Sequence, residues 1–178
     1  CCFRDTYRVV CAYHLHPVAF PRVQTKSLDI LSLRDVAVCL DEFKPDLVIH
    51  CAALTNVDLC EKDPLLAERI NVGGTRNIVN GLEGRPAKLV YLSTDSVYDG
   101  GKGFFSEADP VNPENHYGET KHRGELEALK GVSSLVLRTN IFGWNAEEKA
   151  SLAEWMVHCL REKKPFPGFT DVFFSSIY

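Results

Sequence analysis

The chain has 178 residues, 45% hydrophobic and 25% charged, and its 20 Lys and Arg against 24 Asp and Glu give a net charge of −4. Its longest apolar stretches are far shorter than the ~18 residues that a membrane span requires, so we expect no membrane partner. The mildly acidic balance has no basic stripe that would bind phosphates, so we also expect no nucleic-acid partner.

Seven cysteines and six histidines show no spacing typical of a metal site. The cysteines are odd in number and contain no Cys-x-x-Cys pair, and Cys11, Cys39 and Cys51 lie in apolar runs. A free thiol in such a run behaves as a small hydrophobic group. We therefore predict structural thiols in a reduced, cytoplasmic protein, with no bound metal.

Four short runs rich in β-branched residues alternate with longer segments of helical period. The predicted strands are Arg8–Tyr13, Asp46–Cys51, Lys88–Leu92 and Ser134–Arg138. The predicted helices cover residues 33–43, 64–81, 117–130 and 150–163. Each strand is continuously apolar at its centre, which is typical of strands buried on both faces. The alternation predicts a doubly wound α/β fold, with a parallel sheet sandwiched between helices.

The second predicted helix has a defined beginning and an unusual interior. Asp63 is placed to cap it, and Pro64 occupies the first helical position, where a missing N–H costs nothing. Gly73 and Gly74 lie inside it, and each costs ~1 kcal/mol relative to alanine. The pair indicates close packing against a strand or a partner helix, or else a local break.

Candidate site residues follow the third predicted strand. In an open parallel sheet, ligands bind outside the carboxyl ends of the strands. Ser93, Thr94 and Asp95 come directly after this strand, and the Gly-, Asp- and Pro-rich stretch Asp99–Pro113 follows them. A long irregular stretch inside a compact α/β domain is more often functional than idle.

Tyr117 and Lys121 begin the next helix, four residues apart, so both lie on one face of it. A tyrosine with a pKa near 10 is a poor acid–base catalyst at neutral pH, and a shift of about three units requires ~4 kcal/mol of preference for the phenolate. One cation about 4 Å away supplies roughly that much at an effective dielectric constant of about 20. We therefore predict a lowered pKa for Tyr117, with the Thr94 hydroxyl sharing the substrate oxygen. The Tyr-x-x-x-Lys spacing alone is a weak indication of this chemistry. It becomes a strong indication when it follows a strand that ends in Ser-Thr-Asp.

Together these segments resemble the extended short-chain dehydrogenase/reductase superfamily, and within it the dTDP-4-dehydrorhamnose reductase branch. The resemblance extends over nearly the whole chain. It rests on Tyr91–Gly100, Asn112–Lys121 with Gly124-Glu125, Pro45–Ala53 with Thr55 and Asp58, and Asn71-Val72 with Gly74-Thr75.

The resemblance implies an NAD(P)-binding Rossmann-like fold and hydride transfer to the carbonyl of a nucleotide-linked 4-keto-6-deoxy sugar. It assigns Thr94, Tyr117 and Lys121 to catalysis, with Tyr117 as the proton donor and Lys121 also holding the nicotinamide ribose. The residues expected at the cofactor are Asp29, Ile30, Cys51, Ala52, Ala53, Thr55, Ser93, Tyr117 and Lys121. Those expected at the substrate are Thr94, Asp95, Tyr98 and Asn140. Four of these assignments to a ligand have an equal structural alternative. The two alanines would pack closely at a strand end, Asp95 would be a turn residue, and Tyr98 would be a packed aromatic residue.

The sequence departs from the family pattern at both ends. No glycine precedes Gly73, so we expect the first strand and glycine-rich phosphate loop of the family to be missing from this sequence. We divide the chain into an incomplete NAD(P)-binding domain, residues 1–142, and the beginning of a substrate-binding lobe, residues 143–178.

Asn140 and Ile141 stand where the bacterial rhamnose-pathway enzymes have a serine and a tryptophan, so these residues do not define the sugar. No acid ends the strand at residues 8–13, which favours NADP over NAD.

Two alternative functions keep the same fold. An epimerase or dehydratase would use the same Tyr/Lys chemistry and recycle the cofactor in place, although Thr94-Asp95-Ser96 lacks the second acid that dehydratases often carry. A non-catalytic regulatory subunit, similar to the methionine adenosyltransferase β subunit, would bind a cofactor and a protein partner. The resemblance also implies a homodimer through the glycine-bearing helix.

Overall fold

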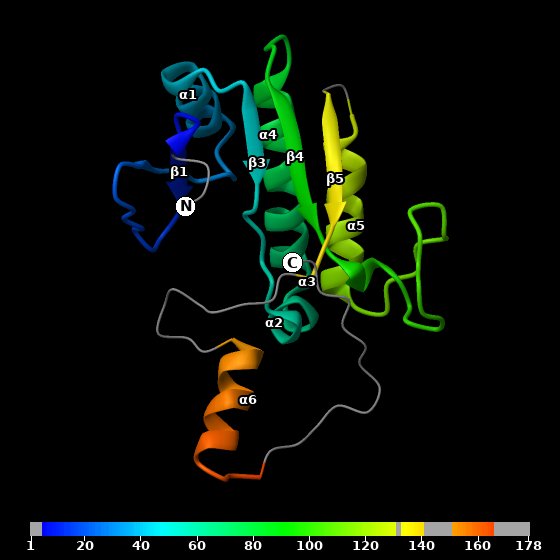
Figure 1. The fold of residues 1–178 in the computed structure, drawn as a ribbon. Coiled ribbons are helices and arrows are strands. Elements are labelled where there is room, and N and C mark those ends of the chain that lie inside the picture. The colour runs from blue at the N-terminus through cyan, green and yellow to red at the C-terminus, as the bar shows by residue number, and fades with distance from the viewer. Residues whose placement is uncertain (1–4, 131–132, 141–150, 166–178) are drawn as a thin grey trace.

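A computed structural model describes residues 5–130, 133–140 and 151–165 of the chain (Figure 1). The strands in these ranges are β1 (Val10–Tyr13), β2 (Gln24–Ser27), β3 (Leu47–His50), β4 (Lys88–Ser93) and β5 (Ser134–Arg138). All of them pair in parallel, β1 with β2 in one sheet and β3–β4–β5 in that order in another. Leu47 lies opposite Lys88, and Leu89 lies opposite Ser134. The predicted parallel α/β, Rossmann-like fold is confirmed.

Helical elements connect the strands, and each of the four predicted helices is present. The elements are α1 (Leu33–Phe43), α2 (Val57–Lys62), α3 (Pro64–Ala67), the π-helical η2 (Glu68–Gly74), α4 (Thr75–Leu82), the 3₁₀ turn η3 (Asp95–Val97), α5 (His116–Ala128) and α6 (Leu152–Arg161). No helix in the described ranges combines the length and the apolar character that crossing a bilayer demands. The sequence analysis missed β2, which is four residues long, and α2, which is six. Segments this short do not display a hydrophobic period.

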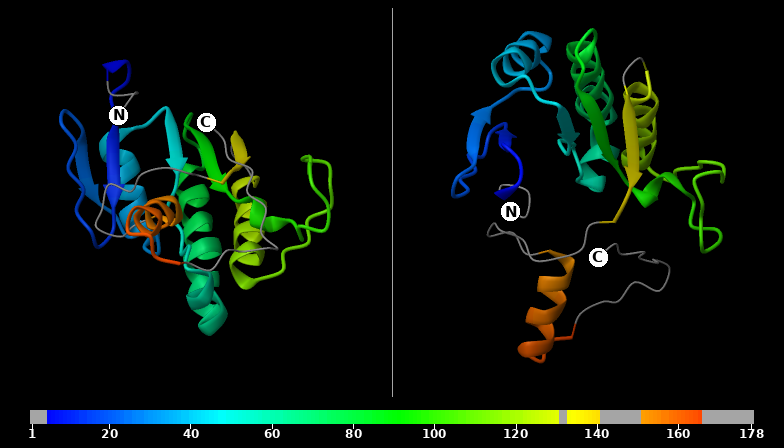
Figure 2. Two further views of the ribbon diagram at one scale, coloured as in Figure 1. Left: turned by 60° about the horizontal axis from the view of Figure 1, so that its bottom comes forward. Right: turned by 45° about the horizontal axis from the view of Figure 1, so that its top comes forward.

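Helices α4 and α5 lie on one face of the three-stranded sheet, and α1 packs beside α4 (Figures 1 and 2). The buried residues of this core come from α1, α4, the start and centre of β4, and α5: Val36, Leu40, Ile78, Val79, Leu82, Ala87, Leu89, Tyr91 and Ala128.

The other face of the sheet is open in the described residues. Leu47 and Ile49 of β3 and Leu135 and Leu137 of β5 are 40–54% exposed, and alternation along a strand places them opposite the helix-covered residues. The prediction that these strands are buried on both faces is therefore wrong for β3 and β5 here. An apolar run shows that a strand suits a buried position, but coverage of each face depends on what packs there.

The predicted helix over residues 64–81 is continuous but changes type at its centre. Asp63 Oδ1 accepts the Leu66 N–H at 3.0 Å, which confirms the predicted cap. The π-helical segment η2 ends in Gly73 and Gly74. A Cβ on Gly74 would lie 2.5 Å from Cδ1 of Ile30, whereas one on Gly73 would meet nothing closer than 4.0 Å. The close packing inferred from the glycine pair is thus present at Gly74, but it is with Ile30 in the turn before α1 and not with a strand or a partner helix. The alternative, a local break, is wrong: the helix changes to the π type and does not stop.

Alanine substitutions separate the roles of the two glycines. Gly73→Ala should stabilise the protein by about 0.5–1 kcal/mol, because alanine loses less backbone freedom on folding. Gly74→Ala should destabilise it by about 1–3 kcal/mol through overpacking, since the new methyl would lie 2.8 Å from Ile30 Cγ1. Urea unfolding followed by circular dichroism measures both changes. Equal effects at the two positions would contradict this assignment.

Candidate active site

Helix α5 places Tyr117 and Lys121 beside the carboxyl end of β4. Its N-cap is Asn115, whose side chain accepts the Gly118 N–H at 2.8 Å. Gly118 lets the first turn of the helix approach η3, because a Cβ at this position would collide with the carbonyl oxygen of Ser96. The helix therefore begins directly against the segment that follows the strand.

Thr94 follows β4, and its side chain lies near enough to the Tyr117 phenol to influence its pKa. The Thr94 hydroxyl also accepts the Ser96 N–H at 3.1 Å, which holds the side chain in place. Thr94 is almost fully buried. The structure thus brings together the two hydroxyls that we expected to share a substrate oxygen.

The pKa of Tyr117 is shifted in the direction opposite to our prediction. Burial raises it above the usual value for a tyrosine, and the nearby Thr94 side chain offsets only part of this effect. The prediction of a lowered pKa is therefore wrong, because burial of the phenol outweighs the groups that would favour the phenolate. A phenol with a raised pKa stays protonated at neutral pH, which is the form that a proton donor requires.

The ammonium group of Lys121 is buried against β4. Its Nζ donates to the Leu92 carbonyl at 2.6 Å and lies 4.2 Å from the centre of the Tyr91 ring. Burial lowers the pKa of Lys121 to about 8, although the nearby Glu125 carboxylate acts in the opposite direction. Lys121 therefore loses its charge as the pH rises through the mildly alkaline range.

A neutral histidine lies beside the Tyr91 ring, at a centroid distance of 5.5 Å. Burial, assisted by the charge of Lys121, lowers the pKa of this residue, His50, to about 3. Its Nε2 lies 3.1 Å from the Thr75 hydroxyl, which itself donates to the Asn71 carbonyl at 2.6 Å. Because the hydroxyl proton is used in that bond, Nε2 is the donor to Thr75. His50 thus adds no positive charge near Lys121 at neutral pH.

Asn71 links the loop after β3 to η2 and α5. The Leu54 N–H donates to its Oδ1 at 2.7 Å, and its Nδ2 donates to the Leu54 carbonyl at 3.2 Å. The same Nδ2 donates to Thr120 Oγ1 at 3.0 Å. Sequence analysis quoted Asn71 only as part of a resemblance and assigned it no role. Its partners lie 17 and 49 residues away along the chain, so no local pattern indicates them.

The residues expected at a cofactor lie after the carboxyl ends of β2, β3 and β4. Asp29 Oδ1 accepts the Leu31 N–H at 2.9 Å, and Ile30 packs against the core. The four expected residues of the loop after β3 are exposed or half-buried: Cys51, Ala52, Ala53 and Thr55. Their short side chains leave the backbone of this loop accessible, which fits a bound dinucleotide. Ser93 is buried instead, and its hydroxyl donates to Glu125 at 2.5 Å.

The residues expected only at the substrate occupy two positions. Asn140 Nδ2 donates to Asp95 Oδ2 at 3.2 Å, so these two side chains lie together after β5 and β4. Tyr98 lies farther along, and its hydroxyl accepts from Arg138 Nη1 at 2.6 Å and donates to the Ser106 carbonyl at 2.8 Å. The Tyr98 hydroxyl is thus engaged within the protein.

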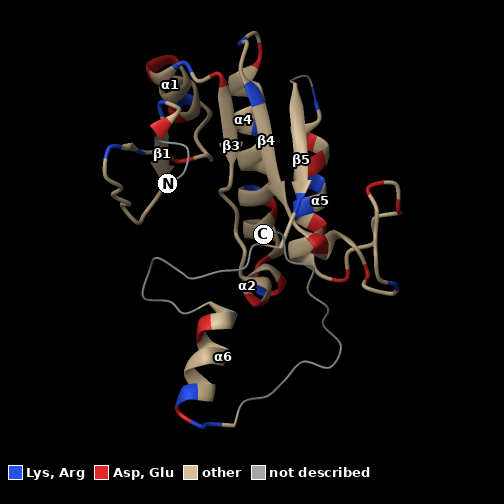
Figure 3. Ribbon diagram, viewed as in Figure 1, with Lys and Arg blue, Asp and Glu red and all other residues tan. Residues whose placement is uncertain are grey.

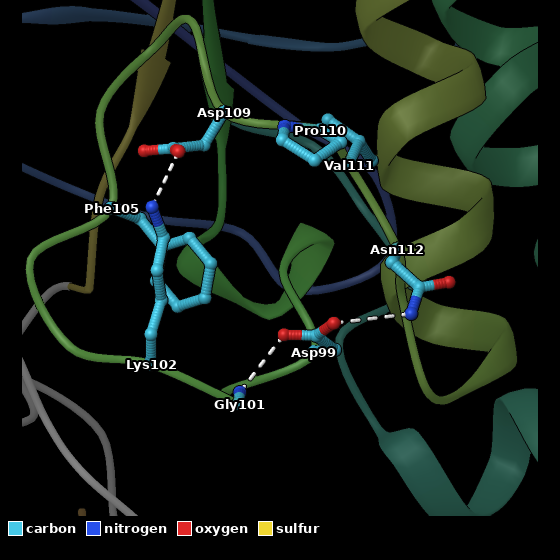
Figure 4. Close-up of a pocket in the computed structure, with 8 residues that line it drawn as sticks. All are labelled: Asp99, Gly101, Lys102, Phe105, Asp109, Pro110, Val111 and Asn112. Carbon is cyan, nitrogen blue, oxygen red and sulfur yellow. Dashed lines mark hydrogen bonds and ion pairs between the residues drawn. The ribbon is translucent and has the colours of Figure 1, made fainter.

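The loop between η3 and α5 borders an open hollow of about 590 Å³ that its own residues line (Figure 4). Lys102 and Asp109 form an ion pair across it. Asp99 accepts the Gly101 N–H at 2.9 Å and Asn112 Nδ2 at 3.2 Å. The charged side chains of the hollow are therefore paired with one another or with the loop backbone.

Glu125 and Arg138 lie next to the site, and no function was predicted for them from the sequence. The available signal for Glu125 was its position one turn after Lys121 on the same helix face. The signal for Arg138 was weaker: a charged residue at the end of an otherwise apolar strand. In the described part of the chain, no three metal-ligating side chains gather into a potential metal site.

A Thr–Tyr–Lys set at the carboxyl end of a parallel sheet thus characterises this Rossmann-like α/β protein. The chain belongs to the RmlD substrate binding domain family, whose sequence model matches residues 9–172. The resemblance to the dTDP-4-dehydrorhamnose reductase branch is confirmed.

Curated relatives and solved structures agree with this placement. A probable low-salt glycan biosynthesis reductase of Haloferax volcanii is 32% identical over 171 residues, which cover 93% of this chain and 56% of that protein. The methionine adenosyltransferase 2 subunit beta of Xenopus tropicalis is 34% identical over 146 residues, or 82% of this chain and 43% of that protein. The chain spans about half the length of the curated relatives it matches.

Among solved structures, dTDP-4-dehydrorhamnose reductase from Bacillus anthracis in complex with NADP has a TM-score of 0.71 and 32% identity, over 79% of this chain and 51% of that one. UDP-glucose 4-epimerase from Brucella ovis in complex with NAD has a TM-score of 0.72 and 26% identity, over 79% and 47% of the two chains. Both likenesses support a Rossmann-like fold.

The lowered pKa of Lys121 predicts a specific pH dependence of stability. Between about pH 8 and the unfolded-state value near 10.4, the unfolded chain keeps a proton that the folded chain has lost. The contribution of Lys121 therefore raises the free energy of unfolding with pH across this window. Urea unfolding at a series of pH values gives the free energy of unfolding of the wild type and of Lys121→Met. The wild-type value minus the Lys121→Met value should increase with pH across this window. Lys62→Met, at an exposed position, is the control. If the free energies of unfolding of wild type and Lys121→Met change in parallel with pH, the assignment is contradicted.

Proposed function

We propose that the protein is an NAD(P)H-dependent reductase of a nucleotide-linked 4-keto-6-deoxy sugar. The single observation that carries this proposal is the placement of a protonated Tyr117 phenol against Thr94, with Lys121 one helical turn away. The family membership and the reductases among the relatives support it.

In this proposal the residues of the chain divide the work of reducing a carbonyl. Thr94 and Tyr117 bind the carbonyl oxygen, and a bound reduced nicotinamide supplies the hydride that reaches the carbonyl carbon. The Tyr117 hydroxyl gives its proton to the same oxygen, so that the ketone becomes a secondary alcohol. Lys121 holds the nicotinamide ribose in this proposal.

The cofactor is NADP in our proposal, with NAD as the alternative. The absence of an acid at residues 13–16 supports NADP, and the solved relatives bind either NADP or NAD. Residues 1–142 form the cofactor-binding part in this proposal, and residues 143–178 begin a substrate-binding lobe. A reduced, cytoplasmic setting agrees with the free cysteines of the described chain, and a homodimer is a proposal from the resemblance alone.

Two other functions follow from specific relatives. Identity to the methionine adenosyltransferase 2 subunit beta favours a regulatory subunit that binds a protein partner. Likeness to a UDP-glucose 4-epimerase favours an enzyme that returns the hydride to its substrate. The three functions differ in net NADPH oxidation with a keto-sugar nucleotide: a reductase oxidises one NADPH per product, an epimerase none. A regulatory subunit would instead co-purify with a synthetase catalytic subunit.

Tyr117→Phe tests the assigned proton donor. It should lower kcat for NADPH-dependent reduction of dTDP-4-dehydrorhamnose by about 10²–10⁴-fold, because the carbonyl oxygen loses its acid. The dissociation constant of NADPH, measured by fluorescence titration, should change little. Tyr7→Phe, at an exposed position before β1, is the matched control. Unchanged turnover in Tyr117→Phe would refute this role.

A further inference from the structure

The structure assigns a positioning role to the buried Glu125 and its half-buried partner Arg138: through Tyr98, they hold the loop of residues 98–112 in place beside the substrate. This inference rests on the proposed function. It deepens that function by naming residues that set sugar binding without touching the reacting atoms.

Glu125 is a buried carboxylate with a full set of partners. It lies on α5, one turn beyond Lys121, and is 2% exposed. Arg138, at the end of β5, donates from Nε to Oε1 at 2.9 Å and from Nη2 to Oε2 at 2.7 Å. Ser93 donates to Oε1 at 2.5 Å, and His122 Nδ1 lies 3.2 Å from Oε2. These bonds fix the orientation of the Arg138 guanidinium, since a two-point contact with a buried carboxylate leaves it little freedom.

The remaining nitrogen of Arg138 reaches out of this buried cluster to the loop. Nη1 donates to the Tyr98 hydroxyl at 2.6 Å, and the guanidinium carbon lies 5.1 Å from the centre of the Tyr98 ring. The Tyr98 hydroxyl in turn donates to the Ser106 carbonyl at 2.8 Å. The Tyr98 ring also stacks on Phe105, with centroids 4.5 Å apart. A chain of contacts thus runs from the catalytic helix through β5 to the middle of the loop.

The loop itself connects the two halves of the candidate site. It begins directly after η3, the short turn that follows Thr94, and it leads back to the start of α5, where Tyr117 lies. The Asn112 N–H donates to the Val97 carbonyl at 3.0 Å and closes the base of the loop. Within the loop, the Ser106 N–H donates to Asp109 Oδ2 at 2.6 Å. Because the loop contributes few residues to the core, its orientation depends on the Tyr98 contacts.

A second Arg–Glu pair, whose glutamate also lies on α5, provides a comparison. Arg76 Nη2 donates to Glu127 Oε1 at 2.8 Å, but the Arg76 side chain is half-exposed and belongs to α4. Acidic and basic residues occur together along α5, as Figure 3 shows, so an ion pair alone does not distinguish Glu125. What distinguishes the Glu125 pair is the lower exposure of its arginine side chain, 20% for Arg138 against 51% for Arg76, and the extension through Arg138 to the loop.

Three variants of the full chain test the inference: Arg138→Lys, Tyr98→Phe and their combination, with Arg76→Lys as the control. Lysine keeps the charge near Glu125 but cannot bond Glu125 twice and Tyr98 at once, and phenylalanine keeps the stack on Phe105 without the hydroxyl. Amide hydrogen exchange of residues 98–112 should quicken by about tenfold in each single variant. The double variant should exchange no faster than the faster single variant, because both changes cut the same connection.

Kinetics give a second readout on the same proteins. KM for dTDP-4-dehydrorhamnose should rise about tenfold in the two single variants, with kcat changed less than about threefold and KM for NADPH unchanged. Unchanged loop exchange in folded Arg138→Lys and Tyr98→Phe, additive effects in the double variant, or an unchanged KM for the sugar nucleotide would overturn the inference. If the wild type oxidises no NADPH with the sugar nucleotide, the proposed function fails, and the exchange data alone decide whether Arg138 and Tyr98 hold the loop.

Discussion

The close approach of helix α5 to the end of β4 is the constraint on which the rest of the site depends. Two glycines permit it: a Cβ on Gly118 would collide with the Ser96 carbonyl, and one on Gly124 with the Tyr91 hydroxyl. At this separation the polar side chains between the glycines reach the strand directly. Lys121 bonds the Leu92 carbonyl, and Thr120 bonds Asn71. A larger residue at either glycine would move the catalytic helix away from the strand and separate these groups.

Two charged groups buried in this contact differ in how they are stabilised. Glu125 accepts hydrogen bonds from Arg138 and Ser93, which keep its pKa below the usual value in spite of burial. Lys121 has a carbonyl and an aromatic ring as its near neighbours, and its pKa falls. Burying a charge with few compensating partners costs free energy, and such residues concentrate at functional sites. The contrast explains why we place Lys121 in the chemistry and Glu125 in the support of the site.

Local patterns predicted the long elements of this fold and the contents of the site, and failed where a property depends on distant segments. The apolar runs and the Asp63-Pro64 start identified four strands and four helices, because each was long enough to repeat its pattern. The polar strand β2 lacks such a pattern, since what makes Gln24–Ser27 a strand is its pairing with β1. Burial on both faces was wrongly expected for β3 and β5, because a run of apolar residues carries no information about what covers it.

The sequence by itself determined the parallel α/β fold, the position of Thr94 after its strand, the shared helix face of Tyr117 and Lys121, and the family that these residues resemble. Tertiary structure alone decided the direction in which the Lys121 ammonium points, and it decided the burial that raises the pKa of Tyr117. It also decided that Glu125 joins a chain of contacts to Tyr98. Spacing along one helix fixes which residues share a face, whereas burial and charge are sums over groups that only folding brings together.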